Sequence, residues 1–386
     1  MKVLNLSNYF NHHQKPLADA LFAILGDEYF FVETASIPEF RKKLGYREIT
    51  APYVLKYNSQ TKNVIDRMIM DADVVIYGEA PLNLIKKRYN TGKLTIRDDE
   101  SRYKNPNRYL KWSIYTYKSH WINKGYLLCA SAYAPIDYML SGMPPQKCYR
   151  WGYFPEVKKI KSIDNLIESR RNSHPNRVSI LWVGRLIPLK HPEAFVYVAE
   201  NLRKDGYDFI MNIIGTGKME TKMMEIVKMK SLSNNIHFLG SMTPEDVRKY
   251  MEDADIFLFT SDRREGWGAV LNESMSSGCA VVADENIGSS PYLIKNGTNG
   301  LTYKSRRFDD LLCKVKWLID HPLEMQEMGK NAYFTLSEKW SGESAATNLI
   351  KLCEALLRGE DTPINEGPCS KAPLLMRKWH GRFSTL

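Results

Sequence analysis

Two glutamates eight positions apart, Glu265 and Glu273, are the residues whose type and spacing most strongly indicate chemistry. A carboxylate has only acceptor oxygens, so each of the two can hold both hydroxyls of a vicinal diol, which hexoses and ribose both carry. Eight residues of helix span about 12 Å at ~1.5 Å per residue, which suits a nucleoside diphosphate that carries a sugar. The pair therefore predicts a site that holds two diols at the ends of one ligand.

Both glutamates stand between two predicted strands. Residues 255–260 (DIFLFT) and 279–283 (CAVVA) are continuous apolar runs, as expected of buried parallel strands. Residues 267–277 are predicted to form a helix that ends at Gly278. Ligands of open α/β sheets bind at the carboxyl ends of the strands. The free N–H groups and the positive dipole end at the start of this helix would therefore suit a diphosphate between the two carboxylates.

Arg185 and Lys190 offer the positive charge that a diphosphate requires. Both lie in the loop VGRLIPLKH at the end of the predicted strand 178–184. The charge on a leaving diphosphate grows as its bond to the sugar breaks, and a guanidinium fork and an ammonium can neutralise it. The sequence contains no Asp-rich metal motif, so we expect metal-independent chemistry without a cofactor, with Arg185, Lys190 and Glu265 as the catalytic residues.

Glycines flank these charged residues. Gly215 and Gly217 form a strand-to-helix turn, which predicts close approach of the backbone to a ligand, although a GxG sequence is also typical of a plain tight connection. We assign the binding of the nucleoside diphosphate and its sugar to eight positions: Gly184, Gly215, Thr216, Gly217, Gly266, Trp267, Gly268 and Glu273.

The two glutamates and their spacing resemble the E-x7-E signature of the retaining, nucleotide-sugar-dependent glycosyltransferases called family 4. Gly184, Arg185 and Lys190 match the G-R-x4-K motif of that family position for position. The resemblance covers residues 178–352 and is weaker in the first half of the chain. It implies the GT-B fold, in which two Rossmann-like doubly wound domains face each other across a cleft that holds the active site. It also implies retention of configuration, with Glu265 fixing the hexose and the second glutamate the ribose.

The first half of the chain offers candidates for the acceptor side. SNYFNHHQKP follows the first predicted strand, and together with WGYFP it resembles the N-terminal region of bacterial polysaccharide glycosyltransferases. Asn11, His12 and His13 are predicted to face the cleft at a helix start, where histidine can hydrogen-bond a hydroxyl or a phosphate; a plain surface pair is the alternative. Asp99 and Glu100, at the end of another strand, are candidates to orient an acceptor hydroxyl, or to cap a helix.

Strands and helices are predicted to alternate, and 386 residues are enough for two α/β domains. A polar stretch that contains a proline, residues 162–177, is predicted to link them. We expect an acceptor-binding Rossmann-like domain over residues 1–172 and a donor-binding one over residues 173–340. Residues 341–386 are expected to form a helix that returns toward the first domain, with Ser341 as its N-cap, and then a loose tail rich in proline and glycine.

The net charge of +10 lies in the first half of the chain. Residues 1–172 carry 27 Lys and Arg against 17 Asp and Glu, whereas residues 173–386 carry 27 of each. This imbalance favours an anionic membrane surface or a phosphate-bearing acceptor as a partner; a solvated surface is the alternative. No recognised nucleic-acid motif accompanies the charge, so we expect no nucleic-acid partner.

The apolar runs are all well short of the roughly 18 residues that span a bilayer, and six scattered cysteines are typical of reduced thiols. We therefore expect a cytoplasmic protein, with a peripheral position on the inner face of the membrane as a further expectation.

These features together predict a hexosyltransferase. It would move a hexose from a nucleotide diphosphate sugar to a hydroxyl of a polysaccharide or lipid-linked acceptor, with UDP preferred over GDP on family frequency. Two alternatives stay open: a nucleotide-sugar epimerase of the same fold, which needs no acceptor, and a non-catalytic nucleotide-sugar-binding protein. A dinucleotide oxidoreductase is disfavoured, because no GxGxxG follows a strand with an acidic residue about twenty positions later.

Overall fold

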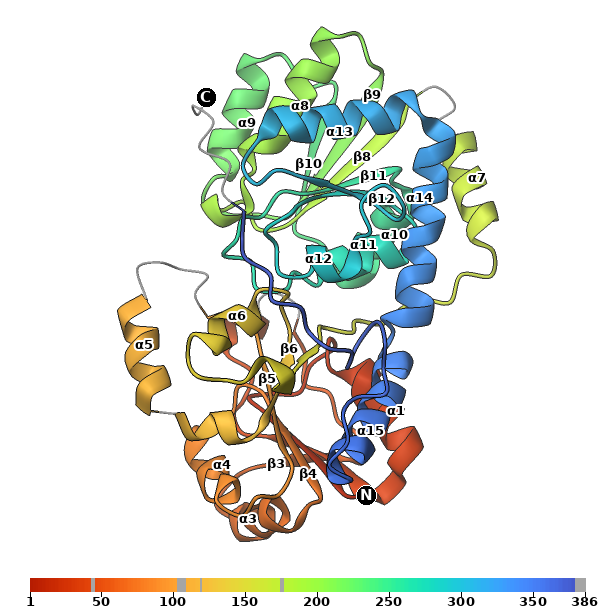
Figure 1. Cartoon of the computed structure of the whole chain (residues 1–386). Coiled ribbons are helices and arrows are strands. Elements are labelled where there is room, and N and C mark those ends of the chain that lie inside the picture. Colours follow the sequence, from red (N-terminus) through yellow and green to blue (C-terminus); the bar gives the residue numbers. More distant parts are fainter. Residues whose placement is uncertain (43–45, 103–108, 119, 174–176, 379–386) are drawn as a thin grey trace. The chain divides into compact units, whose positions relative to one another are not determined.

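The computed structural model describes residues 1–42, 46–102, 109–118, 120–173 and 177–378. The chain divides into two compact units, each with a parallel sheet and its own helices (Figure 1). The first unit consists of Met1–Glu156 and Lys339–Met376, and the second of Val157–Glu338 and the residues from Arg377 onward. Both predicted Rossmann-like α/β sheets are confirmed.

The first unit is built on a seven-stranded sheet in the order β3-β2-β1-β4-β5-β6-β7, in which every neighbouring pair is parallel. Its middle strand, β4, is wholly apolar and buried, as is usual for strands covered on both faces. The strands are β1 (Val3–Ser7), β2 (Tyr29–Glu33), β3 (Val54–Lys56), β4 (Val74–Tyr77), β5 (Thr95–Asp99), β6 (Tyr126–Cys129) and β7 (Cys148–Arg150).

Helices separate these strands along the chain, and a further helix from near the end of the chain also belongs to this unit. The last helix, α15, packs beside α1 within this unit (Figure 1). The predicted cap of α15 is confirmed, since the Ser341 hydroxyl accepts a hydrogen bond from the Ser344 N–H at 3.1 Å. The helices are α1 (Lys15–Leu25), α2 (Glu39–Lys42), α3 (Lys62–Asp71), α4 (Leu82–Tyr89), α5 (Tyr109–Lys118), α6 (Ala134–Met139) and α15 (Gly342–Leu357).

The segment after α15 runs along the edge strand β7, in contrast to the loose tail that its composition predicts. Arg150 accepts a backbone hydrogen bond from Cys369 at 2.8 Å and donates one to Ser370 at 2.7 Å, and Ala372 donates to Cys148 at 3.1 Å. Cys369 and Ser370 are buried. Backbone pairing with the sheet, which composition cannot reveal, orders this proline-rich and glycine-rich segment.

The second unit is built on a six-stranded sheet in the order β10-β9-β8-β11-β12-β13, again with parallel pairs throughout. The four residues of β11 and the five of β12 are all buried, which explains why both are apolar up to Asp284, the last residue of β12. The strands are β8 (Val178–Val183), β9 (Phe209–Ile214), β10 (Ile236–Gly240), β11 (Ile256–Phe259), β12 (Ala280–Asp284) and β13 (Leu301–Tyr303).

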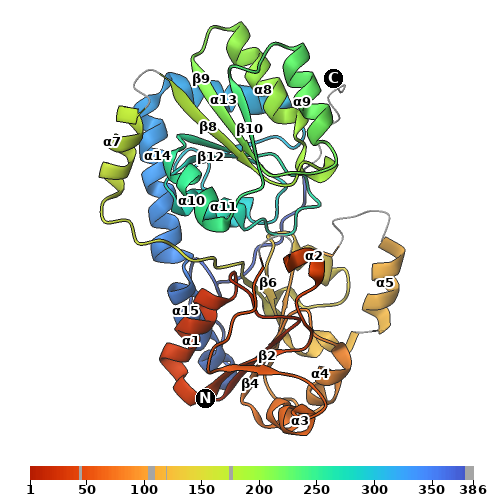
Figure 2. The same ribbon diagram turned by 180° about the vertical axis from the view of Figure 1, so that it is seen from behind.

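Eight helices of this unit lie within the described residues. They are α7 (Ile163–Ser173), α8 (Glu193–Lys204), α9 (Glu220–Met229), α10 (Pro244–Asp253), α11 (Val270–Ser276), α12 (Ser290–Leu293), α13 (Phe308–Asp320) and α14 (Pro322–Phe334). Figure 2 shows α10 and α11 side by side, in agreement with their contacts.

The stretch that we expected to be a linker contains the helix α7. Ile163, Ile167 and Arg170 recur at helical spacing and are buried. The Arg170 guanidinium donates to the backbone oxygens of Glu252, at the end of α10, and of Gly278, after α11. It also donates to the Ser277 oxygen. Because a guanidinium carries five donors, one side chain can satisfy the free carbonyls at the ends of two helices.

Candidate functional site

The carboxyl ends of β8 and β11 form the topological switch point of the second sheet. The strand that follows β8 in the chain, β9, lies on one side of it, and β11 lies on the other side. The loops after the two strands therefore leave the same edge in divergent directions, which in open α/β sheets creates the ligand-binding crevice. The predicted basic loop follows β8 and the loop with the first glutamate follows β11.

The structure brings Lys190 and Glu265 together. The Lys190 ammonium lies 2.5 Å from Oε2 of Glu265, and the two side chains are only 14% and 16% exposed. Two further hydrogen bonds join the loops: the Thr260 hydroxyl donates to the Lys190 oxygen at 2.6 Å, and the Asp262 N–H donates to the Leu189 oxygen at 3.1 Å. The Lys190 ammonium also lies 5.7 Å from the centre of the Phe259 ring.

Arg185 stands at the same edge, directly after β8, and its side chain is exposed. Among the described residues, its guanidinium has neither an ion-pair nor a hydrogen-bond partner. A guanidinium presents five donors in a planar fork that matches phosphate oxygens. The residue is therefore placed to accept an anionic ligand without first breaking a contact within the protein.

The glycines of the basic loop and of the turn after β9 pack against each other. Gly215 has φ +129°, and a Cβ there would lie 2.0 Å from the Gly184 carbonyl oxygen. A Cβ at Gly217 would lie 2.5 Å from the Leu186 oxygen, and the Leu186 N–H donates to the Thr216 oxygen at 2.9 Å. The contact between the two loops explains the GxG sequence, while the Thr216 side chain stays exposed.

Helix α11 begins at Val270, later than the predicted start at residue 267. Gly268 has φ +85°, and a Cβ there would lie 2.4 Å from Cζ of Phe259, so the chain is not yet helical at this point. The Trp267 ring is completely buried, and its Nε1 donates to Oδ1 of Asn272 at 2.8 Å. Trp267 and the buried Gly266 thus shape the loop that carries the first glutamate.

Glu273 lies on α11 and is partly buried. Its backbone oxygen accepts a hydrogen bond from Arg248 at 2.9 Å and another from the Ser277 hydroxyl at 2.8 Å. Its carboxylate makes no hydrogen bond with any residue that the structure describes. Burial raises the pKa of Glu273 above its ordinary value, although Arg248 acts in the opposite direction. A partly desolvated carboxylate with open acceptor sites suits a ligand diol.

Two residues beside this pair, His191 and Asp262, are absent from the prediction. His191 Nε2 lies 3.0 Å from Oδ2 of Asp262, and Nδ1 lies 2.8 Å from Oε1 of Glu193. The only sequence signal was their position beside Lys190 and Glu265. The contact itself joins residues 71 positions apart, so no local pattern reveals it.

The candidates Asn11, His12 and His13 lie in the first unit, between β1 and α1. The Asn11 side-chain oxygen accepts from the His13 N–H at 3.0 Å, and the two imidazole rings lie 4.0 Å apart. The His12 ring also contacts Tyr46, with centres 4.8 Å apart. Burial, with His12 and Arg41 nearby, lowers the pKa of His13 to about 3, so this imidazole is neutral at physiological pH.

The candidates Asp99 and Glu100 are already engaged within the first unit. Asp99 forms ion pairs with Arg97 at 2.7 Å and with Arg102 at 3.4 Å, and accepts from the Tyr138 hydroxyl. Burial alone would raise the pKa of Asp99, but the two arginines outweigh it and lower the pKa to about 2. Glu100 accepts from the Tyr153 hydroxyl at 2.7 Å.

Asp98, next to them, differs in its charge state. Burial, together with the neighbouring Asp99 charge, raises the pKa of Asp98 to about 8, so this carboxyl group is mostly protonated at neutral pH. The first unit therefore presents a mixed set of neutral and ionised acids at the carboxyl end of β5.

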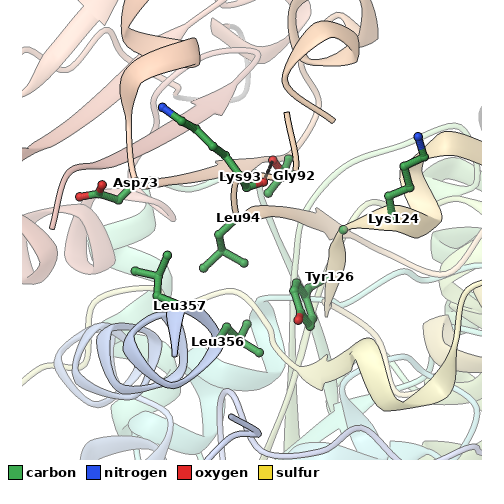
Figure 3. Close-up of a pocket in the computed structure, with 10 residues that line it drawn as sticks. Asp73, Gly92, Lys93, Leu94, Lys124, Tyr126, Leu356 and Leu357 are labelled. Atoms are coloured by element: carbon green, nitrogen blue, oxygen red, sulfur yellow. Dashed lines mark hydrogen bonds between the residues drawn. The ribbon is translucent and has the colours of Figure 1, made fainter. Parts of the chain in front are cut away.

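A separate pocket of about 300 Å³ lies at the amino ends of strands of the first sheet (Figure 3). Asp99 and Glu100 lie at the other end of β5, its carboxyl end. The lining of the pocket includes residues at or before the amino ends of β4, β5 and β6, namely Asp73, Thr95 and Tyr126, together with Leu356 and Leu357 of α15. It contains none of the predicted site residues. The predicted donor-site residues all belong to the second unit, and the five predicted acceptor residues all belong to the first.

The match to a known family model lies within the second unit. Residues 164–334 match the family model described as glycosyl transferases group 1. The chain is 28% identical over 201 residues to poly(ribitol-phosphate) alpha-N-acetylglucosaminyltransferase of Staphylococcus aureus, a match that covers 51% of this chain and 40% of the relative. It is 30% identical over 166 residues to the amylovoran biosynthesis glycosyltransferase AmsK of Erwinia amylovora, which covers 41% and 39%. The chain thus spans well under two thirds of the length of these relatives.

The whole fold has counterparts among solved structures. The crystal structure of Anabaena HepE in complex with UDP aligns with a TM-score of 0.68 at 14% sequence identity, over 91% of this chain and 98% of that one. The likeness shows that the two α/β units have the GT-B fold, as predicted. Residues 164–334, which match the family model of glycosyl transferases group 1, contain every predicted donor-site residue.

Proposed function

We propose that this protein is a retaining glycosyltransferase. It transfers a hexose from a nucleotide diphosphate sugar, with UDP as the nucleotide, to a hydroxyl of a polysaccharide or lipid-linked acceptor. The observation that carries the proposal is the Lys190–Glu265 ion pair at the switch point of the second sheet, with the exposed Arg185 guanidinium at the same edge.

The charged groups at this end of the sheet match the parts of such a donor. Arg185 and Lys190 would bind the diphosphate, and Glu265 would accept hydrogen bonds from hexose hydroxyls. The carboxylate of Glu273, which has no hydrogen-bond partner among the described residues, would accept them from the ribose diol. A ligand that spans both carboxylates would contact the two loops and α11 at once.

In the proposed reaction, the bond between the anomeric carbon and the diphosphate oxygen breaks, and a bond from the same carbon to the acceptor oxygen forms on the same face of the sugar. The acceptor proton passes to a phosphate oxygen of the leaving group. Arg185 and Lys190 stabilise the negative charge that grows on the diphosphate, which is worth most in a partly desolvated site. The two cations supply this stabilisation without a metal ion.

The relatives support the class of ligand. The S. aureus relative is named for the transfer of N-acetylglucosamine to poly(ribitol-phosphate), and the Anabaena structure contains UDP. We carry over to this chain the use of UDP and of a polymeric acceptor as parts of the proposal.

Nucleotide binding provides the first test. We expect UDP and one or more UDP-sugars, but not NAD, to raise the melting temperature equally in EDTA and in magnesium, because a ligand that binds only the native state stabilises it. Turnover of the stabilising donor is then followed with and without saccharide acceptors, and the product anomer is determined by NMR. An inverted product would refute the retaining reaction, and an altered free sugar formed without acceptor would indicate an epimerase.

We also propose an anionic membrane surface as a partner of the first unit. Residues 101–150 carry eight Lys and Arg against one acidic residue, Asp137. One face of α5 exposes three apolar side chains beside two lysines, an arrangement typical of helices that lie on a membrane surface. These residues are Leu110, Ile114, Tyr117, Lys111 and Lys118. Among the described residues, the structure contains no helix with the length and apolar character to cross a bilayer.

Vesicle binding tests this partner. The protein should sediment with vesicles that contain phosphatidylglycerol, less with pure phosphatidylcholine, and less as salt rises, because the attraction is screened. The double variant Leu110→Ser, Ile114→Ser should lose most of this binding. Leu323→Ser, which changes a leucine of the second unit with a similar exposure, is the matched control. Equal binding by both variants would rule out α5 as the docking helix.

A further inference from the structure

His191 occupies a constrained position between the basic loop and helix α8. It directly follows Lys190, its backbone is left-handed with φ +47°, and its side chain is only 10% exposed. A left-handed conformation is unfavourable for a residue with a Cβ, so the surrounding contacts must hold it in place.

Both imidazole nitrogens face carboxylates. Nδ1 lies 2.8 Å from Oε1 of Glu193, and Nε2 lies 3.0 Å from Oδ2 of Asp262. An ionised carboxylate can only accept hydrogen bonds, so both ring nitrogens must donate, which requires the imidazolium form. Burial alone would lower the pKa of His191, but the hydrogen bonds to the two carboxylates outweigh it and raise the pKa to about 9.

Asp262 connects His191 to the loop that carries Glu265. Its carboxylate accepts hydrogen bonds from the Arg264 N–H and guanidinium at 2.9 Å, and its backbone oxygen accepts from the Glu265 N–H at 2.9 Å. Its own N–H donates to Leu189, on the other side of Lys190 from His191. The imidazolium therefore joins the backbone segments that carry the two members of the Lys190–Glu265 pair.

Further groups near this contact come from β12, from β13 and from the segment that connects β13 to the start of α13. Asp284, at the end of β12, is buried, and burial raises its pKa to about 7, while the His191 charge acts against that rise. The neighbouring groups on the elements packed around the imidazole are Glu193, Asp262, Arg264, Asp284, Tyr303, Arg306 and the ring of Phe308.

We propose that His191 is a positioning residue that, as an imidazolium, holds the Lys190 loop against the Glu265 loop and so fixes the geometry of the ion pair at the donor diphosphate. The inference rests on the proposed transferase function. When His191 loses its proton, one of its two carboxylate contacts loses its donor, which interrupts the chain of contacts from Asp262 through the imidazole to Glu193 on α8. Donor turnover should therefore fall as the pH rises through the pKa of His191.

The protonation state can be measured independently of any activity. In a ¹⁵N correlation spectrum of the imidazole groups, the His191 signals are assigned by their loss in His191→Asn, a change to a residue that tolerates positive φ. We expect both ring nitrogens to be protonated at pH 7.5 and one proton to be lost near pH 9. A neutral ring at pH 7.5 would overturn the proposal, whether or not the protein is a transferase.

The kinetic arm uses the same variant. His191→Asn should lower kcat about tenfold, which corresponds to about 1.4 kcal/mol of barrier, and should remove the alkaline decline near pH 9. His321→Gln changes a partly buried histidine of the same unit, between α13 and α14, and should behave as wild type. If His191→Asn does not fold, Asp262→Asn, which removes the negative charge from one side of the same contact, should lower the pKa of His191 and so move the decline to lower pH. A kcat within twofold of wild type and an unchanged alkaline decline in the variant that folds would refute the role.

Wild-type results separate the two proposals. A wild-type protein that binds no nucleotide sugar and has no transferase activity would refute the proposed function, whereas an active wild type with an unaffected variant would refute only the role of His191.

Discussion

The Lys190 ammonium and the Glu265 carboxylate lie 2.5 Å apart, although 75 positions separate them in the chain. Each is largely shielded from water, so each charge would be costly to leave without the other. The pair brings a cation and a diol-binding acceptor to the same point of the sheet edge. A donor that binds there contacts both side chains. A substitution at either residue therefore removes the ion-pair partner of the other as well as a contact with the ligand.

Removal of the Lys190 charge should impair chemistry more than binding. We expect Lys190→Ala to lower kcat by about 10²–10³-fold, the effect typical of losing one group that stabilises charge in the transition state. Lys228→Ala, at an exposed position of α9, is the matched control. Steady-state kinetics with the donor identified by thermal shift measures both. A Lys190→Ala enzyme with normal kcat would exclude this residue from the catalytic group.

Arg185 should show the same preference for the transition state. Arg185→Ala should reduce kcat more than it raises the donor KM, because the negative charge on the diphosphate grows as the sugar leaves. Arg185→Lys keeps the charge but loses the planar fork, so it should restore only part of the activity. Full activity of Arg185→Lys would show that the fork geometry is not used. Wild-type kcat and KM in Arg185→Ala would exclude the residue from the site.

Glu273 should act on binding. Glu273→Gln retains the shape but loses the charge, so we expect the nucleotide Kd to rise about 10–100-fold, the loss expected for hydrogen bonds to a charged group. Calorimetry with UDP measures it, and Glu225→Gln on the exposed surface of α9 is the control. An unchanged Kd would mean that Glu273 does not touch the nucleotide.

The same residue predicts a pH dependence. Burial raises the pKa of Glu273 above 4.5, so the carboxylate form that accepts the ribose hydroxyls is fully present at neutral pH and is lost as the pH falls through this raised pKa. Nucleotide affinity should therefore begin to weaken at a pH above 4.5 in the wild type. In Glu273→Gln, calorimetry across the same range should show no such decline. A decline of equal size in both would assign the titration to another group.

Arg170 should affect stability and not catalysis directly. Arg170→Leu would leave the carbonyl oxygens of Glu252, Ser277 and Gly278 without this donor, at a cost of about 1–3 kcal/mol for each group left unsatisfied. Urea unfolding followed by tryptophan fluorescence should show a clear loss of stability, whereas Arg171→Leu, one position along and exposed, should change it little. Equal stability of the two variants would contradict the capping role.

The sequence predicted the sheets well because buried parallel strands are continuous apolar runs. It did not predict β3, whose three residues are only partly buried or exposed and form no such run. It did not predict α7 either, because this helix is mostly polar and Arg170 appears in the sequence as one more surface charge. The carbonyl partners of Arg170 lie 82 and more than 100 positions away, so only the fold reveals its role.

The candidate site divides in the same way. Lys190 and Glu265 were found because each belongs to a short motif beside a strand, and the switch-point topology then brings the motifs together. His191 and Asp262 belong to no motif. Their contact depends on the left-handed backbone of His191, which the sequence does not predict. The sequence places Trp267 among the donor residues because of its neighbours, but its ring is part of the packed interior of the loop.

The segment that pairs with β7 has a practical consequence for expression of this protein. An edge strand with free N–H and C=O groups is a template for pairing with another chain, and here Cys369, Ser370 and Ala372 occupy that edge. A chain cut after Leu357 would expose the edge along with the buried side chains beneath it. Truncation to the end of α15, which the composition of the tail invites, should therefore produce self-association and inclusion bodies in place of a smaller soluble enzyme.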